Sequence, residues 1–122
     1  MEPGKLNLLV PQGTTWSKQL NWIDSDDDPV PLAGYTARMQ VRKTVATQGT
    51  PVLSLTTENG RITLGPGDGE ILLSIDATTT AALPTNRVKQ TWRYDLELVS
   101  GGGAVTRLLE GKFVVTPEVT RA

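Results

Sequence analysis

The chain has 122 residues, with 12 Lys and Arg against 13 Asp and Glu, for a formal net charge of −1. A domain of this length can bury a hydrophobic core without covalent staples. The chain has no cysteine and no histidine, which excludes disulfides, thiolate metal sites, the usual zinc ligands and the commonest general base. The near-neutral charge argues against electrostatic binding of nucleic acid. No apolar stretch is long enough to span a bilayer and the start lacks a signal-peptide pattern, so we expect a protein made and kept in a cytoplasm.

Short runs of alternating apolar and polar residues, separated by glycine and proline, predict many short β-strands. In the second run Trp16 and Leu20 share a face that Lys18 interrupts, so we expect that part of the strand to lie near an edge or opening. No internal repeat is visible. The expected strands cover residues 6–10, 14–23, 35–43, 51–57, 62–64, 71–75, 88–99 and 105–116.

Turn signals fill the gaps between these runs. Residues 24–29, rich in aspartate and ended by proline, predict a hairpin tip. The pair Asn59 and Gly60 predicts a tight hairpin. One short helical turn is expected from Asp76, which caps it, to Leu83, which precedes a proline.

Seven to nine short strands with one helical corner predict an all-β fold, an antiparallel β-sandwich, with a small barrel as the alternative. We expect a single domain over residues 1–122 with short polar arms at residues 1–5 and 118–122. On the final strand, Val105 and Leu109 are expected to point inward with the apolar residues that follow. The predicted core between the sheets is Trp16, Leu20, Trp22, Met39, Val41, Leu73, Tyr94, Leu96 and Phe113.

The order of these elements resembles an immunoglobulin-like sandwich. In that fold a tyrosine near the start of the penultimate strand follows a tight corner, and its hydroxyl bonds back to upstream backbone. Here the corner from Asp76 to Pro84, followed by Tyr94, has that arrangement. The chain lacks both core cysteines of the antibody form, so the resemblance implies the architecture only.

The chain is also similar to small virion proteins of tailed bacteriophages and prophages. Their recurring segment LTGYTARMQIRK is matched by LAGYTARMQVRK at residues 32–43. Residues 56–64, and residues 94–98 with 106–111, follow in the same order, and the opening of the chain resembles the N-terminal domain of upper baseplate proteins. The likeness extends over about residues 6–120. It implies a place in a particle rather than a chemical reaction.

This resemblance implies a non-enzymatic structural component of a tailed phage particle, located in the virion and assembled in the host cytoplasm. We expect a tail, collar or baseplate adaptor or attachment protein that forms a ring. Its partners would be other virion proteins and copies of itself, with no nucleic acid, membrane or cofactor. A capsid cement or decoration protein is the alternative. A carbohydrate-binding module is a third hypothesis.

Two patterns that resemble ligand sites are interpreted as turns. Asp24, Asp26 and Asp28 have the spacing of a calcium loop but lack its glycine and its closing glutamate, so we expect a solvated acidic turn. Residues 65–69 are rich in glycine but lack the lysine and the following helix of a phosphate loop. We therefore expect no metal site and no phosphate site.

Charged residues on two strands leave two interpretations open. Asp95 and Glu97 share a strand face about 7 Å apart, a spacing that suits an acid–base pair, but they face outward, where an ion-pair ladder is expected instead. Basic residues beside them predict either ordinary charges paired to these carboxylates or an interface with an acidic protein ring. The final strand contains no proline and is expected to be an open edge that contacts other subunits. The candidate interface residues are Arg38, Arg42, Lys43 and Arg93.

Overall fold

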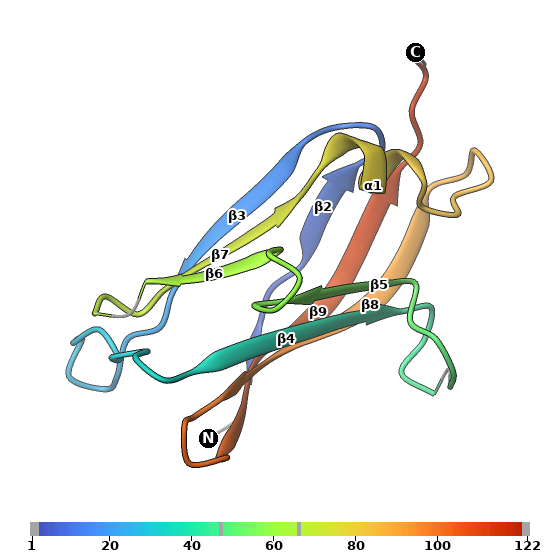
Figure 1. The fold of residues 1–122 in the computed structure, drawn as a ribbon. Coiled ribbons are helices and arrows are strands. Elements are labelled where there is room, and N and C mark those ends of the chain that lie inside the picture. Colours follow the sequence, from blue (N-terminus) through green and yellow to red (C-terminus); the bar gives the residue numbers. More distant parts are fainter. Residues whose placement is uncertain (1–2, 47, 66, 121–122) are drawn as a thin grey trace.

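The computed structural model describes residues 3–46, 48–65 and 67–120. They form two β-sheets packed face to face (Figure 1). The six-stranded sheet has the order β1-β9-β8-β4-β5, with β2 also paired to β9, and the three-stranded sheet has the order β3-β7-β6. The elements are β1 (Gly4–Lys5), β2 (Leu8–Pro11), β3 (Trp16–Asn21), β4 (Thr36–Arg42), β5 (Leu53–Thr56), β6 (Ile62–Gly65), β7 (Glu70–Ile75), α1 (Ala77–Ala81), β8 (Gln90–Val99) and β9 (Val105–Thr116).

This strand order confirms the predicted immunoglobulin-like sandwich. Strands β3, β7 and β6 make one sheet, and β5, β4, β8 and β9 make the other, as in the two sheets of that fold. These strands pair antiparallel, whereas β1 and β2 run parallel to β9 along its outer edge. The nine strands of the described residues fall within the expected seven to nine.

The core lies between the sheets, and β2, β4, β5, β7 and β8 each contribute buried residues at every second position. Six of the nine predicted core residues are buried there: Met39, Val41, Leu73, Tyr94, Leu96 and Phe113.

Three predicted core residues, Trp16 and Leu20 of β3 and Trp22 just after it, are only partly buried and pack against the core. The reason is that β3 is an edge of the narrower sheet, with a neighbour on one side only. Lys18 lies on this edge strand directly opposite the fully buried Leu73, yet it is itself exposed. The expectation that Lys18 marks an edge is confirmed.

Two predicted hairpin turns lie in connections between the sheets. The tip predicted at residues 24–29 is confirmed as a local hairpin loop, because Val30 N–H donates to Trp22 O at 2.9 Å and Asp24 N–H donates to Asp28 O at 2.8 Å. Residues 24–28 form a compact loop, closed by an antiparallel bridge between Ile23 and Pro29, but β3 and β4 on either side belong to different sheets. The Asn59–Gly60 turn likewise joins β5 to β6 across the sandwich. The Asn59 carboxamide oxygen accepts hydrogen bonds from the backbone N–H groups of Thr56 and Arg61, at 3.0 Å each. This side chain therefore holds the crossing turn that replaces the hairpin.

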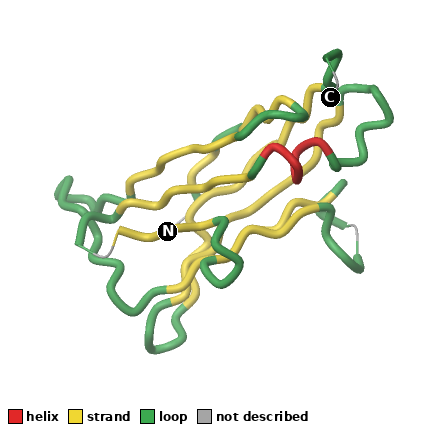
Figure 2. Tube along the Cα trace, turned by 45° about the horizontal axis from the view of Figure 1, so that its top comes forward, coloured by secondary structure: helices red, strands yellow, loops and turns green. Residues whose placement is uncertain are grey.

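The predicted helical corner is confirmed as α1. Asp76 is its N-cap and accepts a hydrogen bond from the backbone N–H of Thr79. Hydrogen bonding by the Thr79 side chain, and to a lesser extent by its backbone N–H, holds the pKa of Asp76 below its usual value. The carboxamide of Gln12 fastens the corner to the turn after β2, because it donates to the carbonyl oxygens of Ala81 and Leu83, at 3.0 and 3.1 Å. Figure 2 shows this single helix, in red, among mostly extended chain.

The predicted inward and outward alternation along β9 is interrupted by a β-bulge. Glu97 lies opposite Arg107 but its neighbour Leu96 lies opposite Leu109, so the strand holds one extra residue at this point. The bulge reverses the faces before it: Val105 points outward and is 51% exposed, whereas Phe113 beyond the bulge is fully buried. The inward position expected for Val105 is therefore wrong.

The predicted open edge at β9 is also wrong for most of the strand. Gly4 and Lys5 pair with Leu109 and Glu110, and β2 pairs with the strand from Phe113 to Thr116. Only the first part of β9 extends beyond these partners. Part of the expected N-terminal arm is thus a strand of the sheet. The edges of the six-stranded sheet lie at β5 and at β1 and β2, and those of the three-stranded sheet at β3 and β6.

Candidate interaction surface

The outer face of the six-stranded sheet carries a row of three positive charges on adjacent strands. The register places Arg42 of β4 directly opposite Arg93 of β8, and Arg93 directly opposite Lys112 of β9. These side chains point away from the core, because successive residues of a strand face opposite sides and Trp92 and Phe113, the chain neighbours of Arg93 and Lys112, are buried. Arg93 and Lys112 are exposed and Arg42 is half-buried. We call these three residues the basic row.

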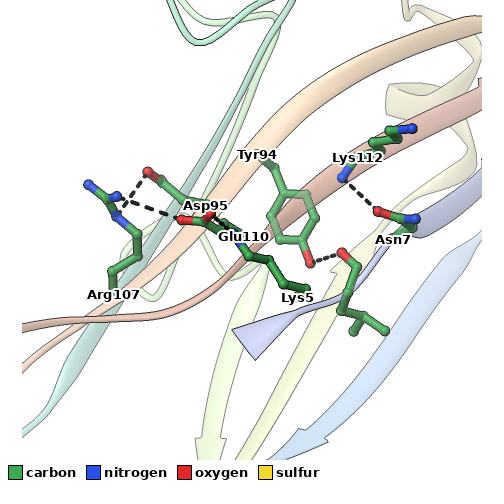
Figure 3. A network of polar contacts seen from close by, with 8 residues as sticks. Lys5, Asn7, Tyr94, Asp95, Arg107, Glu110 and Lys112 are labelled. Carbon is green, nitrogen blue, oxygen red and sulfur yellow. Dashed lines mark hydrogen bonds and ion pairs between the residues drawn. The ribbon is translucent and has the colours of Figure 1, made fainter. Parts of the chain in front are cut away.

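The next row toward the β8–β9 turn carries Asp95 and Glu110, directly opposite each other. Arg107 contacts both, with its guanidinium 3.6 Å from Asp95 and 3.7 Å from Glu110. Lys5 forms a further ion pair with Glu110 (Figure 3). The carboxylates of this row are therefore compensated by Arg107 and Lys5 rather than by the basic row.

The pKa values of these two carboxylates shift in opposite directions. Burial raises the pKa of Asp95, and the nearby Glu97 carboxylate raises it further. The hydrogen bond from Lys5 lowers the pKa of Glu110 below its usual range. The surface thus holds its negative charge at the edge beside β1 and disfavours it at the centre of the sheet.

The basic row has a different set of contacts. Arg42 donates to the carbonyl oxygen of Gly49 at 2.7 Å and to the side-chain oxygen of Gln40 at 2.9 Å. Within the described part of the chain, no carboxylate lies within ion-pair distance of Arg93 or Lys112. Like charges directly opposite each other on neighbouring strands are destabilising. Arg93 lies between two like charges, an arrangement that in general disfavours strand pairing.

A shallow groove of about 580 Å³ runs over this face between the N-terminal segment and the loop after β4. Its charged lining comes from Lys5, Arg42, Arg93, Arg107, Asp95 and Glu110, four basic residues against two acidic ones.

The structure separates the four predicted interface residues. Arg42 and Arg93 are neighbours, as expected. Arg38 lies four residues before Arg42 in β4. Its Nε atom is 2.8 Å from the carboxylate of Glu97 on the neighbouring strand, so these two residues form an ordinary cross-strand ion pair. Lys43 is exposed in the loop just after β4 ends, outside the strand.

Sequence reasoning missed Lys112, the third member of the row. Counting forward from the glycine turn without a bulge would place Gly111, and not Lys112, opposite Arg93. The bulge at Leu96 and Glu97 shifts this register by one residue. No sequence signal marks that bulge, since Leu108 and Leu109 are both apolar.

The other candidate sites of the sequence have structural roles. Asp24 accepts hydrogen bonds from the backbone N–H groups of Asp26 and Asp28, at 2.9 and 3.0 Å, as in a self-capped turn. Among the described residues no cluster of Asp and Glu has the arrangement of a metal site. Asp95 and Glu97 contact different arginines, in agreement with the predicted ion-pair ladder.

The three tryptophans pack against other rings. Trp92 is stacked on Phe113, with ring centroids 6.5 Å apart, and Trp16 meets the same ring edge-on at 6.4 Å. Trp22 meets Tyr35 edge-on at 6.0 Å. These rings belong to the core and its rim. They do not form the exposed aromatic surface that a carbohydrate-binding module uses.

Fold and surface together define an immunoglobulin-like β-sandwich whose outer sheet face is charged. In the described part of the chain, no helix has the length and apolar character needed to cross a membrane. No protein-family model and no curated protein sequence matches the chain.

Three solved structures are similar to this chain at a distance. Murine CRIg is 11% identical with a TM-score of 0.37, and the match covers 92% of each chain. The extracellular domain of the voltage-gated sodium channel beta4 subunit is 12% identical with a TM-score of 0.38, over 98% of this chain and 97% of that one. Extracellular domains 3–5 of Drosophila OTK are 10% identical with a TM-score of 0.33, over 91% of this chain and 32% of that one. At this level of similarity, the function and the partners of these proteins are not assigned to this chain.

Proposed function

We propose that this protein is a non-enzymatic structural component of a tailed phage particle, a tail, collar or baseplate adaptor that docks through the outer face of its six-stranded sheet. The observation that carries the proposal is the basic row, Arg42, Arg93 and Lys112. A row of like charges costs a free domain stability and suits a module that meets acidic groups on a neighbouring subunit.

The phage-like segment at residues 32–43 supports the same assignment. It contains β4, which contributes Arg42 to the row and the buried Met39 and Val41 to the core. The similar stretch therefore includes both the structural centre of the sheet and part of its charged face. Each exposed charge pair contributes only about 0–1 kcal/mol, so several pairs acting together would set the specificity.

The test is to ask whether the chain is part of purified particles. Phage particles induced from a host that carries the gene would be purified on a density gradient and probed with an antibody against this chain. Electron cryomicroscopy would then locate it. We expect several copies arranged symmetrically on the tail, with Arg93 and Lys112 against a neighbouring subunit.

Two results would contradict the proposal. Absence of the chain from purified particles excludes a structural role in the virion. A position on the capsid shell replaces the tail assignment with that of a cement or decoration protein. As a control, particles carrying Lys89→Glu, a change in the loop before β8, should keep the chain, while particles carrying Arg93→Glu should lose it.

A further inference from the structure

The end of the sandwich that carries the loop between β3 and β4 is strongly acidic. The sequence has no basic residue between Lys18 and Arg38, nor between Arg61 and Arg87. Backbone hydrogen bonds bring the two segments together, because Trp22 N–H donates to Gly69 O at 2.8 Å. The six exposed carboxylates of this acidic end are Asp24, Asp26, Asp27, Asp28, Asp68 and Glu70.

The acidic end and the basic row lie at opposite ends of the domain. The acidic loop leads into the start of β4, while Arg42 is the last residue of β4. Strand β4 thus separates them by roughly 20 Å, from the rise of about 3.3 Å per residue. Figure 1 shows the loop between β3 and β4 and the β6–β7 turn at one end of the sandwich, and the end of β4 at the other. A single molecule cannot bring the two surfaces into contact.

We propose that a second copy of this chain docks its acidic loop, residues 24–28, onto the basic row and its groove. This inference rests on the proposed function and names the partner of that same surface. The loop is a compact tip closed by the Ile23–Pro29 bridge, with its side chains exposed. The groove is lined by Arg42 and Arg93 of the row and by Arg107 beside it. The acidic loop and the groove with the basic row carry opposite charges. The loop projects from the domain and the groove is recessed.

Such a contact joins two different surfaces and is therefore heterologous. Each copy has one acidic end and one basic row, so a bound pair still has one free acidic end and one free basic row. Repetition of the same contact closes into a ring or extends into a filament. This connectivity agrees with the ring expected from the phage-like segment.

Charge-swapped variants of the full chain test the contact. The row variant carries Arg93→Glu with Lys112→Glu. The loop variant carries Asp26→Lys with Asp28→Lys, and leaves Asp24, which holds the turn, and Asp27, which has a positive φ of 63°, unchanged. A control for the row variant, Arg87→Glu with Lys89→Glu, makes the same change in net charge in the loop before β8. Circular dichroism checks that each variant folds.

Sedimentation equilibrium over a concentration series reads out the result. Wild type is expected to gain mass with concentration at about 0.01 M salt, and to lose that gain at about 1 M salt, where the Debye length falls from about 30 Å to about 3 Å. Each variant alone should stay monomeric, because its like-charged surfaces repel. An equimolar mixture of the two should associate again, since each then offers a complementary surface to the other, while the control should behave as wild type.

Three outcomes would overturn the inference. Wild type that stays monomeric at low salt has no such contact, and its detection in purified particles would still leave the proposed function standing. Self-association of the loop variant at the level of wild type would exclude the acidic loop and indicate symmetric pairing of two outer faces. If the row variant misfolds, the neutral variant Arg93→Gln replaces it, with a partial loss of association expected, and an unchanged mass overturns the contact.

Discussion

The hydroxyl of Tyr94 in β8 donates a hydrogen bond of 2.7 Å to the carbonyl oxygen of Leu6, the residue at which the N-terminal segment passes from β1 to β2. Tyr94 lies directly opposite Gly111 of β9. A side chain at Gly111 would meet the Leu6 oxygen, since a Cβ built there lies only 2.1 Å from it. The N-terminal segment therefore crosses the edge of the sandwich at Gly111 of β9, which has no side chain, and beside Tyr94 of β8, whose hydroxyl donates a hydrogen bond to it.

The immunoglobulin resemblance implies a tyrosine hydroxyl that bonds back to upstream backbone, and Tyr94 makes such a bond. In that fold the acceptor lies only a few residues upstream. The observed acceptor lies 88 residues upstream, in the first segment of the chain. The tyrosine therefore fastens the N-terminal segment to the sheet, while Gln12 fastens the helical corner.

Tyr94→Phe should lower the free energy of unfolding by about 1–3 kcal/mol, because it removes the donor and leaves a buried carbonyl oxygen without it. Chemical denaturation monitored by tryptophan fluorescence would measure the change. Tyr35→Phe, at a less buried ring, is the matched control and should change stability by less. Equal effects of the two variants would show that the Leu6 bond adds nothing.

The stability of the protein should fall at strongly alkaline pH, in part through Tyr94. Burial raises the pKa of Tyr94 to about 12, against about 10 in the unfolded chain. The unfolded state therefore loses its proton first, so this contribution is complete below about pH 10 and is lost as the pH rises through about 12. Unfolding free energies measured across this window should decline less steeply for Tyr94→Phe than for wild type. Parallel curves would contradict the assignment.

Gly111→Ala should destabilise the fold by about 1–3 kcal/mol, the usual cost of forcing a methyl group into a filled space. The atom in its way is the backbone oxygen of Leu6, which cannot move without breaking the pairing of β1 and β2 with β9. Thermal unfolding would measure the effect. Gly102→Ala, in the turn before β9 with its nearest neighbouring atom 4.0 Å away, should be nearly neutral. A neutral Gly111→Ala would mean that the N-terminal segment is not held at this point.

Lys18→Val should raise the tendency to aggregate without lowering stability. Lys18 sits on the inner side of edge strand β3, between Trp16 and Leu20, where a charge discourages pairing with another sheet edge. Valine would complete an apolar face on an open edge. Light scattering during heating would detect the change, and Gln19→Val, on the opposite side of the same strand, is the control. Greater aggregation of the control would assign the effect to surface hydrophobicity alone.

Local sequence patterns were sufficient where the determining interaction lies within one element. Alternation at Ala37, Met39 and Val41 predicts β4 and its buried face, and these three residues are at most 1% exposed. Asp76 predicts the start of α1 for a similar reason, because a cap needs only the next few backbone N–H groups. The solvated turn at Asp24 follows from the same short-range hydrogen bonding.

Local sequence patterns gave wrong predictions where the structure depends on which strand, distant in the chain, pairs with a given strand. The Asn59–Gly60 turn has the chemistry of a hairpin, yet the chain crosses there between sheets, and Asn59 satisfies backbone groups of the crossing instead. The edge expected at β9 is covered by the N-terminal strands, more than 100 positions away in the chain.

The sequence by itself determined the alternating strands, the helical corner, and the sandwich architecture, because periodicity and caps depend on neighbours in the chain. Only the tertiary structure decided which charges meet on the outer face. Arg42, Arg93 and Lys112 come from three strands, and their alignment depends on a single bulge in β9. One inserted residue moves every side chain before it to the other face of the strand, and neither composition nor spacing records where that insertion lies.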